Sequence, residues 1–356
     1  MIDFKTAING IGMISAAGTD VKFLSKRLNG DGLGWRVTKQ SRETVFDAGV
    51  PAQKLRRVNR YSRLAVAAAV QSLRDAGESG RTADPFRGGT IFTTGYGSMS
   101  SNVAFCLSVA EGEPDLCGPS LFSGTVANAC VGQVCIQLNM KGPSTVLIGG
   151  NIFLYSKLLL EMDRADVIFA GAVEEYDADL FASLEKNEIA SGVCINEATV
   201  VFALGQRNEA SRCLVGESSV SALSGYPLVK RLSDEESEMS MRLALRECLD
   251  KNGGADVVLS SANGSYFDEI EARAIAVEAP YAEVAHGVKG FFGETMGAAF
   301  SMNVAAGALC LTDRCFAEGL GVSRAPDKIL AAGYDPIGNY NCIVLSKNGR
   351  GDDGTA

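Results

Sequence analysis

The stretch Gly287-Val-Lys-Gly-Phe-Phe-Gly-Glu-Thr-Met-Gly-Ala-Ala299 is the most informative part of this 356-residue chain. It has the frame of an active-site loop, because Lys289 and Glu294 stand among glycines and alanines. His286, directly before the stretch, is the single histidine of the whole chain. Composition therefore excludes any mechanism that needs two imidazoles.

Composition and charge set the outer bounds of the fold. With 46% hydrophobic and 21% charged residues, the chain has an ample core for one large unit or two fused halves. Its 40 glycines favour the tight turns of an α/β protein over a helical bundle. The net charge of -9 argues against nucleic acid as a partner. Without a signal peptide or an apolar stretch long enough for a membrane span, we expect a cytoplasmic protein.

Ten cysteines are scattered along the chain without a CxxC pair. Several lie in apolar or small-residue surroundings, where a reduced thiol behaves as a small hydrophobic group. The sequence therefore predicts structural thiols, no metal and no cofactor. A metal site at Cys130 and Cys135 is the weaker alternative, since no histidine lies near them in sequence.

One helix-strand unit occurs twice. Ser62–Gly77 and Ser240–Gly253 are amphipathic helices that end in glycine, and the buried strands Gly89–Ser98 and Ala255–Ser265 follow them. Each strand leads into a small-residue loop and a further helical stretch. This pattern predicts a duplicated α/β domain, with coincidence between two ordinary units as the alternative.

The two halves are expected to meet after the strand Ala198–Leu204, in the linker Gly205–Ser211. This gives an N-terminal half over 1–205 and a C-terminal half over 206–348. The Gly/Asp-rich residues 349–356 are expected to form a short disordered tail.

Several segments, in this order and spacing, resemble the β-ketoacyl synthases of the thiolase fold over nearly the whole chain. They are Ala7–Gly18, Gly95–Ser98, Gly142-Pro143, Ala165–Gly171, Glu197-Ala198, and Lys289 with Gly293–Ala299. The resemblance implies an α/β thiolase-like fold, with two duplicated halves packed as a layered α-β-α-β-α core.

The resemblance also implies where a catalytic cysteine and two histidines would stand. The cysteine position falls at Asn151, with Gly150 as the alternative because the following helix is shorter than the family usually has. The first histidine position is Asn263, in a shortened loop, and the second is Glu294. Of the usual polar set only Lys289 remains, so we expect no catalytic residue in this chain.

Within the family, this combination of losses is typical of chain length factors in type II polyketide and aryl-polyene-type systems. These non-catalytic subunits pair with an active ketosynthase that works on acyl carrier protein, and they shape the tunnel for the growing chain. The alternative is a stand-alone thiolase-fold enzyme or acyl-binding protein with a re-purposed pocket of Glu294, Lys289 and Asn263.

The segment Leu121–Val134 resembles the helix that lines the shared tunnel in chain length factors, where bulky residues limit product length. Here the expected tunnel positions are small: Gly124, Thr125, Val126, Ala127, Asn128 and Ala129. They favour a long, straight product such as a polyene. Close helix packing at a dimer interface is the alternative explanation for these small residues.

The basic run Lys54–Arg63 precedes the first amphipathic helix. Because carrier proteins are acidic and this chain is acidic overall, local charge reversal is needed for docking. We expect Arg56 and Arg57 to contact the carrier, with a solvated, ion-paired helix start as the alternative.

Two further expectations concern the rim of the site. His286 is expected to be a buried or half-buried imidazole with a satisfied hydrogen bond rather than a catalytic group. The segment Gly333–Tyr340 stands where the family carries a flexible glycine-rich gate loop, and it has bulky residues instead.

Overall fold

A computed structural model describes residues 4–21, 24, 43–112 and 118–349. The predicted tail, except for Gly349, and Cys117 lie outside the described residues. Ten strands form one mixed sheet: β1 (Thr6–Ser15), β2 (Gly88–Thr94), β3 (Ser144–Ile148), β4 (Val167–Glu174), β5 (Ala198–Gln206), β6 (Cys213–Ala222), β7 (Val257–Leu259), β8 (Glu283–Ala285), β9 (Lys328–Tyr334) and β10 (Asn339–Lys347).

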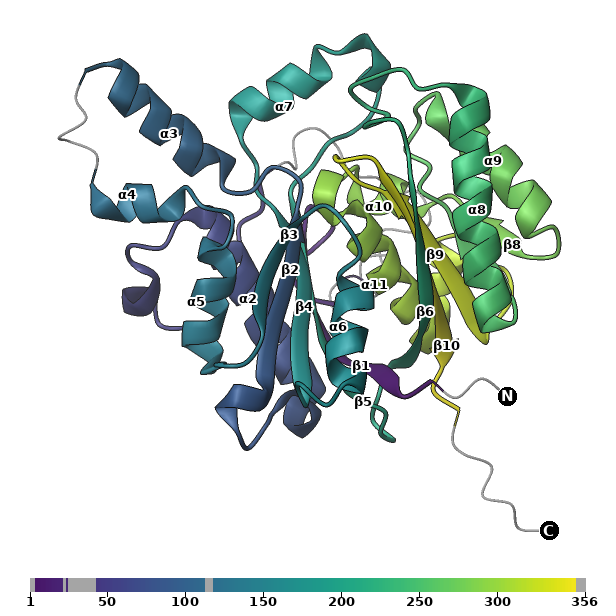
Figure 1. The fold of residues 1–356 in the computed structure, drawn as a ribbon, viewed down its shortest axis with the longest axis horizontal. Helices are drawn as coiled ribbons and strands as arrows, with labels where there is room; N and C mark the ends of the chain where they lie inside the picture. The colour runs from purple at the N-terminus through teal and green to yellow at the C-terminus, as the bar shows by residue number, and fades with distance from the viewer. Residues whose placement is uncertain (1–3, 22–23, 25–42, 113–117, 350–356) are drawn as a thin grey trace.

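The helices pack against the faces of this sheet (Figure 1). They are α2 (Arg60–Ala76), α3 (Met99–Ala110), α4 (Pro119–Gly124), α5 (Ala129–Leu138), α6 (Ile152–Glu161), α7 (Ala178–Glu185), α8 (Asp234–Asn252), α9 (Phe267–Glu278), α10 (Val288–Phe292), α11 (Ala299–Thr312) and α12 (Arg314–Gly319). Three short 3-10 turns, Ala52–Leu55, Glu188–Ala190 and Met296–Ala298, border segments discussed below.

The sheet repeats its own topology. From its two outer edges inward, the strands run β3-β2-β4-β5-β1 and β8-β7-β9-β10-β6, so each half uses its five strands in the same order. The innermost strands β1 and β6 join the halves through two residue pairs, Ala7 with Leu214 and Ile8 with Cys213. The predicted duplication of the α/β unit is therefore visible in the strand order.

The layers follow from where apolar side chains point. In the middle layer, Phe153 of α6 packs edge-on against Phe202 of β5 and Phe300 of α11. Ala299–Leu311 of α11 is buried along its whole length, which suits a helix with sheet on both sides. Helices α2 and α5 cover one outer face, and α8 and α9 cover the other (Figure 1). The predicted α-β-α-β-α core is confirmed.

Local sequence accounts for the first outer helix. The Asn59 side chain accepts from the Ser62 amide to begin α2, and Gly77, at a φ of 57°, ends it. A Cβ at Gly12 of β1 would lie 1.9 Å from the Ala68 carbonyl, so glycine there lets α2 pack directly on the strand.

Three element predictions were wrong in extent. The second repeat helix begins at Asp234, because Ser233 caps it and three acidic residues favour its first turn. The strand expected over Ala255–Ser265 is regular only over Val257–Leu259. The first strand ends at Thr94, where Gly95 and Tyr96 donate their amides to the Glu174 carboxylate instead of continuing the ladder.

Candidate active site

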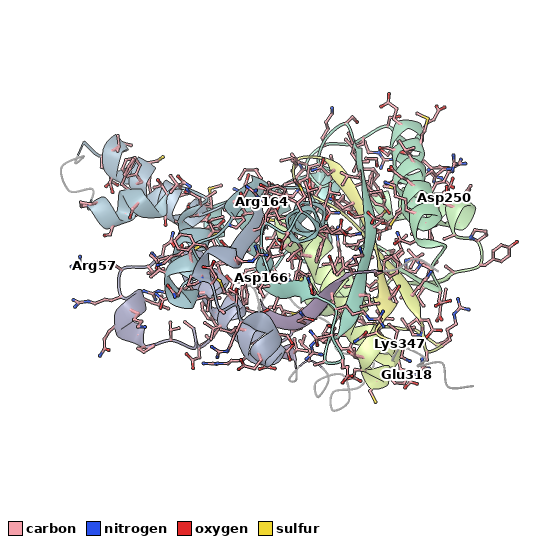
Figure 2. The ribbon with its side chains drawn as sticks, turned by 60° about the horizontal axis from the view of Figure 1, so that its bottom comes forward. Arg57, Arg164, Asp166, Asp250, Glu318 and Lys347 are labelled. Atoms are coloured by element: carbon pink, nitrogen blue, oxygen red, sulfur yellow. The ribbon has the colours of Figure 1, made fainter. Side chains whose placement is uncertain are left out.

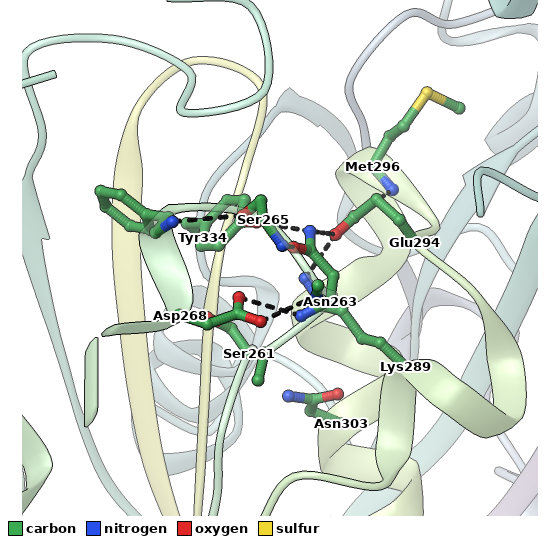
Figure 3. A network of polar contacts seen from close by, with 12 residues as sticks. Ser261, Asn263, Ser265, Asp268, Lys289, Glu294, Met296, Asn303 and Tyr334 are labelled. Atoms are coloured by element: carbon green, nitrogen blue, oxygen red, sulfur yellow. Dashed lines mark hydrogen bonds and ion pairs between the residues drawn. The ribbon is translucent and has the colours of Figure 1, made fainter. Parts of the chain in front are cut away.

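Three segments bring the predicted polar residues of the second half together at the carboxyl ends of its strands. Asn263 lies in the loop between β7 and α9, Lys289 on α10, and Glu294 in the turn before α11. Asp268 shapes the shortened first loop, because its carboxylate accepts from the amides of Asn263 at 3.0 Å and Gly264 at 2.7 Å. Figure 3 shows the resulting cluster, which also includes Tyr334 of β9.

Glu294 is the hub of this cluster. Its Oε2 accepts from Lys289 Nζ at 2.5 Å and from Asn263 Nδ2 at 2.8 Å, and its Oε1 accepts from the Met296 amide at 2.9 Å (Figure 3). The side chains of Lys289 and Glu294 are 2% and 0% exposed. A carboxylate buried this deeply needs its cation and its hydrogen bonds, and Glu294 has them.

Tyr334 closes the cluster on its other side. Its hydroxyl accepts from Asn263 Nδ2 at 2.7 Å, and its ring lies 4.4 Å from Lys289 Nζ, within cation-π distance. Burial raises the pKa of Tyr334 well above its usual value, so the phenol stays neutral. Lys289 thus has one charged partner and one aromatic partner, an arrangement that holds the lysine in place.

A pocket of about 360 Å³ opens over the cluster. It is lined by Gly192, Cys194, Ala262, Asn263, Gly264, Asp268, His286, Lys289, Gly290 and Glu294. His286 stands at its rim. The expectation of a buried or half-buried imidazole was wrong, because the residue is exposed. The expected hydrogen bond is present, since the His286 Nδ1 lies 2.8 Å from Ser260 Oγ.

Asn151 lies elsewhere, in the turn between β3 and α6. It is the N-cap of α6, where its Oδ1 accepts from the amides of Phe153 at 3.0 Å and Leu154 at 3.2 Å. Gly149 and Gly150 precede it with φ values of 67° and 92°, which suit glycine. Neither Asn151 nor Gly150 lines the pocket over Glu294. The side chain caps a helix, and an amide cannot carry an acyl group.

The tunnel segment differs from its prediction. The helix expected over Leu121–Val134 is two helices, α4 and α5, and the small residues fall in the break between them. The break is held by side chains from α2 and α3 or just before them. Asn59, Asn102 and Tyr61 donate to the carbonyls of Gly124, Thr125 and Ala127, so these carbonyls take partners outside their own helix.

The same small residues are open to solvent in the single chain. Val126 and Asn128 are exposed, and Gly124, Thr125, Ala127 and Ala129 are intermediate. They lie on the side of the molecule from which α3 and α4 project (Figure 1). This segment is therefore a surface of the single chain.

Arg56 and Arg57 are exposed at the end of the 3-10 turn Ala52–Leu55. Figure 2 shows Arg57 pointing away from the body of the protein. Neither makes an ion pair within the described part of the chain, whereas Arg60 of the same run binds Glu197 and Glu43. The run thus contains one ion-paired arginine, Arg60, at the start of α2 and two exposed arginines before it.

The thiols of Cys130 and Cys135 do not form a shared site. Cys130 contacts the Tyr61 hydroxyl and Cys135 the Thr90 hydroxyl, so the two thiols serve different neighbours. Burial raises the pKa of Cys130 to about 12.

No cluster of three metal-ligating side chains occurs among the residues described. None of the described helices has both the length and the apolar character to cross a membrane.

Sequence reasoning missed two buried carboxylates at the end of β4. Glu174 accepts from the Gly95 amide, from Thr94 Oγ1 at 3.1 Å and from the Tyr96 amide at 3.3 Å. Desolvation outweighs these hydrogen bonds and raises the pKa of Glu174 to about 8 and that of its neighbour Glu175 to about 7. The sequence feature that could have indicated them is the pair of adjacent glutamates that follows the apolar residues of β4.

These carboxylates predict a pH dependence. Glu174 keeps its proton up to about pH 8 in the folded chain but loses it near 4.5 when unfolded, so its stabilising contribution falls as pH rises through 8. We expect the free energy of unfolding, measured in urea, to fall by up to roughly 1.4 kcal/mol per pH unit for each group, up to about pH 7 for both groups and from there to about pH 8 for Glu174 alone. Glu174→Gln should roughly halve the slope below pH 7 and remove it between pH 7 and 8. The exposed control Glu111→Gln should leave it unchanged, and equal slopes in both variants would contradict the assignment.

Comparison with known proteins identifies the class. The model of the family "Beta-ketoacyl synthase, N-terminal domain" matches residues 10–191, more than half of the chain. The protein belongs to the β-ketoacyl synthase family. No match was found among curated proteins.

Solved structures share the fold of nearly the whole chain. The ishigamide ketosynthase/chain length factor is 20% identical, with a TM-score of 0.76, covering 98% of this chain and 100% of that one. AntDE:AntF, a type II polyketide synthase acyl-carrier protein in complex with its ketosynthase, is 14% identical, with a TM-score of 0.77 and coverage of 97% and 100%. A β-ketoacyl synthase from Burkholderia phymatum STM815 gives the same identity, score and coverage.

Proposed function

We propose that this chain is a non-catalytic ketosynthase subunit, a chain length factor, that pairs with an active β-ketoacyl-ACP synthase. The observation that carries the proposal is the buried ion-pair cluster of Glu294, Lys289 and Asn263. By the family resemblance, Asn263 and Glu294 stand where an active ketosynthase carries its two histidines. Condensation needs imidazoles that hydrogen-bond the thioester and the developing enolate. A lysine-bound carboxylate does neither.

An uncovered apolar surface supports a partner subunit. β3 is an outermost strand of the sheet, and its Ile148 is half exposed. Leu154 and Leu158 of α6 and Ile136 of α5 are exposed as well, on the helices that follow and precede β3 in the chain. Open edge strands and exposed apolar surfaces are normally covered in a native assembly. A ketosynthase of the same fold is the partner we propose for this surface.

A second set of apolar side chains supports the tunnel role. Helix α3 carries no charged residue, and its Phe105 stacks on Phe122 of α4 with ring centroids 5.6 Å apart. Leu107 and Phe122 are more than half exposed. An acyl chain that extends between two subunits needs such an apolar wall, and the small residues Gly124–Ala129 leave room beside it.

The tunnel role predicts a change in product length. Ala127→Phe, tested in the reconstituted complex, should shorten the main product by at least one extension unit, because the ring would fill space beside Gly97, whose added Cβ would lie 3.5 Å from Ala127. Product masses would be measured by liquid chromatography and mass spectrometry. Val277→Phe, an exposed position on α9 outside the proposed partner surface, is the control. An unchanged length distribution in Ala127→Phe would contradict the tunnel role.

Carrier docking predicts a change in affinity. Reversing both charges in Arg56→Glu/Arg57→Glu should weaken binding of acyl carrier protein about ten-fold at low salt, since each projecting arginine lies free to meet an acidic surface. Titration of labelled carrier protein measures this. Lys186→Glu/Lys347→Glu, at two exposed lysines outside the run Lys54–Arg63, is the matched control. Equal effects of the two double variants would dispose of a docking role for Arg56 and Arg57.

The alternative is a stand-alone enzyme or acyl-binding protein with a re-purposed pocket. The pocket of about 360 Å³ over Glu294 favours it, because a desolvated carboxylate beside a lysine is a possible general base. This alternative predicts a stable homodimer. The proposed function instead predicts an obligate heterodimer.

Co-expression separates the two functions. The chain would be produced alone and together with a neighbouring-gene ketosynthase that has an intact Cys/His/His set, and each sample would be sized by light scattering. We expect a 1:1 heterodimer from co-expression and misassembly of the chain alone. A well-folded homodimer that ignores the ketosynthase would support the alternative.

A further inference from the structure

The turn between β3 and α6 has the form of an anion-binding turn. Gly149 and Gly150 take positive φ values of 67° and 92°, and the ten-residue helix α6 begins directly after Asn151. Backbone amides and the helix dipole at such a turn favour a negatively charged group. Here the Gly149 amide binds the Thr94 carbonyl, and the first amides of α6 bind Asn151 Oδ1. The Gly150 amide takes its acceptor from a distant part of the chain.

Asp335 supplies the anion. Its Oδ2 accepts from the Gly150 amide at 2.7 Å, across 185 positions of sequence. The same oxygen accepts from Asn339 Nδ2 at 2.9 Å and from Asn341 Nδ2 at 3.4 Å. Its Oδ1 accepts from the amides of Ile337 at 3.1 Å and Asn339 at 3.0 Å. The side chain is buried, and it makes no ion pair with any cation of the described residues, so N–H groups alone satisfy the carboxylate.

The turn that carries Asp335 is also packed down sterically. A Cβ at Gly149 would lie 2.5 Å from Ile337 Cγ1, and a Cβ at Gly95 would lie 2.5 Å from Pro336 Cγ. Glycine at both positions lets residues 335–338 sit directly on the turn before α6 and on the loop after β2. By the family resemblance, this segment stands where the family carries a glycine-rich gate loop.

We propose that Asp335 is an internal carboxylate latch, which occupies the anion-binding turn before α6 and holds the β9–β10 turn closed over it. Because the Gly150 N–H is already bonded to Asp335, this amide is not available to the carbonyl oxygen of a thioester. The latch goes beyond the loss of the catalytic residues. A cysteine introduced at position 151 would directly follow the amide that binds the buried Asp335 carboxylate, and a nearby negative charge disfavours a thiolate.

Thiol reactivity tests the latch without a partner or a substrate. Asn151→Cys and Asn151→Cys/Asp335→Asn would be alkylated with iodoacetamide over a range of pH, and labelling of the introduced thiol would be followed by peptide mass spectrometry. We expect the midpoint of the double variant to lie lower by about one pH unit or more, since a nearby carboxylate raises the pKa of a thiol by about that much. Asn151→Cys/Asp313→Asn, which removes the carboxylate cap of α12, should match the single variant. Equal midpoints in all three proteins would overturn the latch.

A second measurement serves if the cysteine variants do not fold. Hydrogen exchange of the Gly150 amide would be compared in the unmodified chain, Asp335→Ala and Asp313→Ala. The latch predicts exchange at least ten-fold faster in Asp335→Ala alone, because the acceptor of that amide is gone. Unchanged exchange in Asp335→Ala would show that the Asp335 to Gly150 contact does not hold the turn.

Discussion

Lys289→Met is expected to lower the free energy of unfolding by about 3–5 kcal/mol, the typical cost of leaving one partner of a buried ion pair alone. Glu294 would keep its bonds to Asn263 and Met296 but would lose its only cation among the described residues while fully shielded from water. Urea denaturation followed by circular dichroism measures the loss.

Two further variants make this result specific. Lys157→Met breaks ion pairs with Glu161 and Glu217, whose side chains are 45% and 46% exposed, and should cost about 1 kcal/mol or less. Lys289→Met/Glu294→Gln should recover a large part of the loss, because it removes the charge that was left alone. Equal losses of unfolding free energy in Lys289→Met and Lys157→Met would contradict the assignment of Lys289 and Glu294 as a buried, stabilising ion pair.

Leu158→Asp is expected to weaken the proposed heterodimer by about 100-fold or more. An apolar side chain at the centre of an interface contributes about 2–4 kcal/mol, and each 1.4 kcal/mol is a factor of ten. A buried aspartate would add its desolvation cost. Analytical ultracentrifugation of the co-expressed pair measures the dissociation constant.

Leu243→Asp is the matched control, because Leu243 is 59% exposed and Leu158 50%, but Leu243 lies on α8, on the outer face of the other half. It should leave the dissociation constant unchanged. Equal weakening by both variants, or by neither, would contradict an interface at β3 and α6.

The local signals in the sequence predicted most of the framework. The glycine stop of α2 and the buried strands β2 and β5 follow from short-range patterns of apolar and small residues. The grouping of Asn263, Lys289 and Glu294 followed from the family resemblance. Their mutual hydrogen bonds then depend on a fold that brings two loops to the same end of the sheet.

The errors came from contacts between distant residues. The helix expected over Leu121–Val134 is broken because Asn59, Tyr61 and Asn102 capture its carbonyls. Asp335 meets Gly150 from 185 positions away, and nothing in the local sequence of either indicates the other. Such pairings are set by the packing of the two halves and not by local propensity.

The most direct test of the proposed function asks which chain carries the acyl group. The complex would be incubated with acyl-loaded carrier protein, and intact mass spectrometry would weigh each subunit. We expect acylation of the ketosynthase subunit alone, and none after its active-site cysteine is replaced by alanine. An acyl adduct on this chain, or turnover by this chain without its partner, would contradict the account.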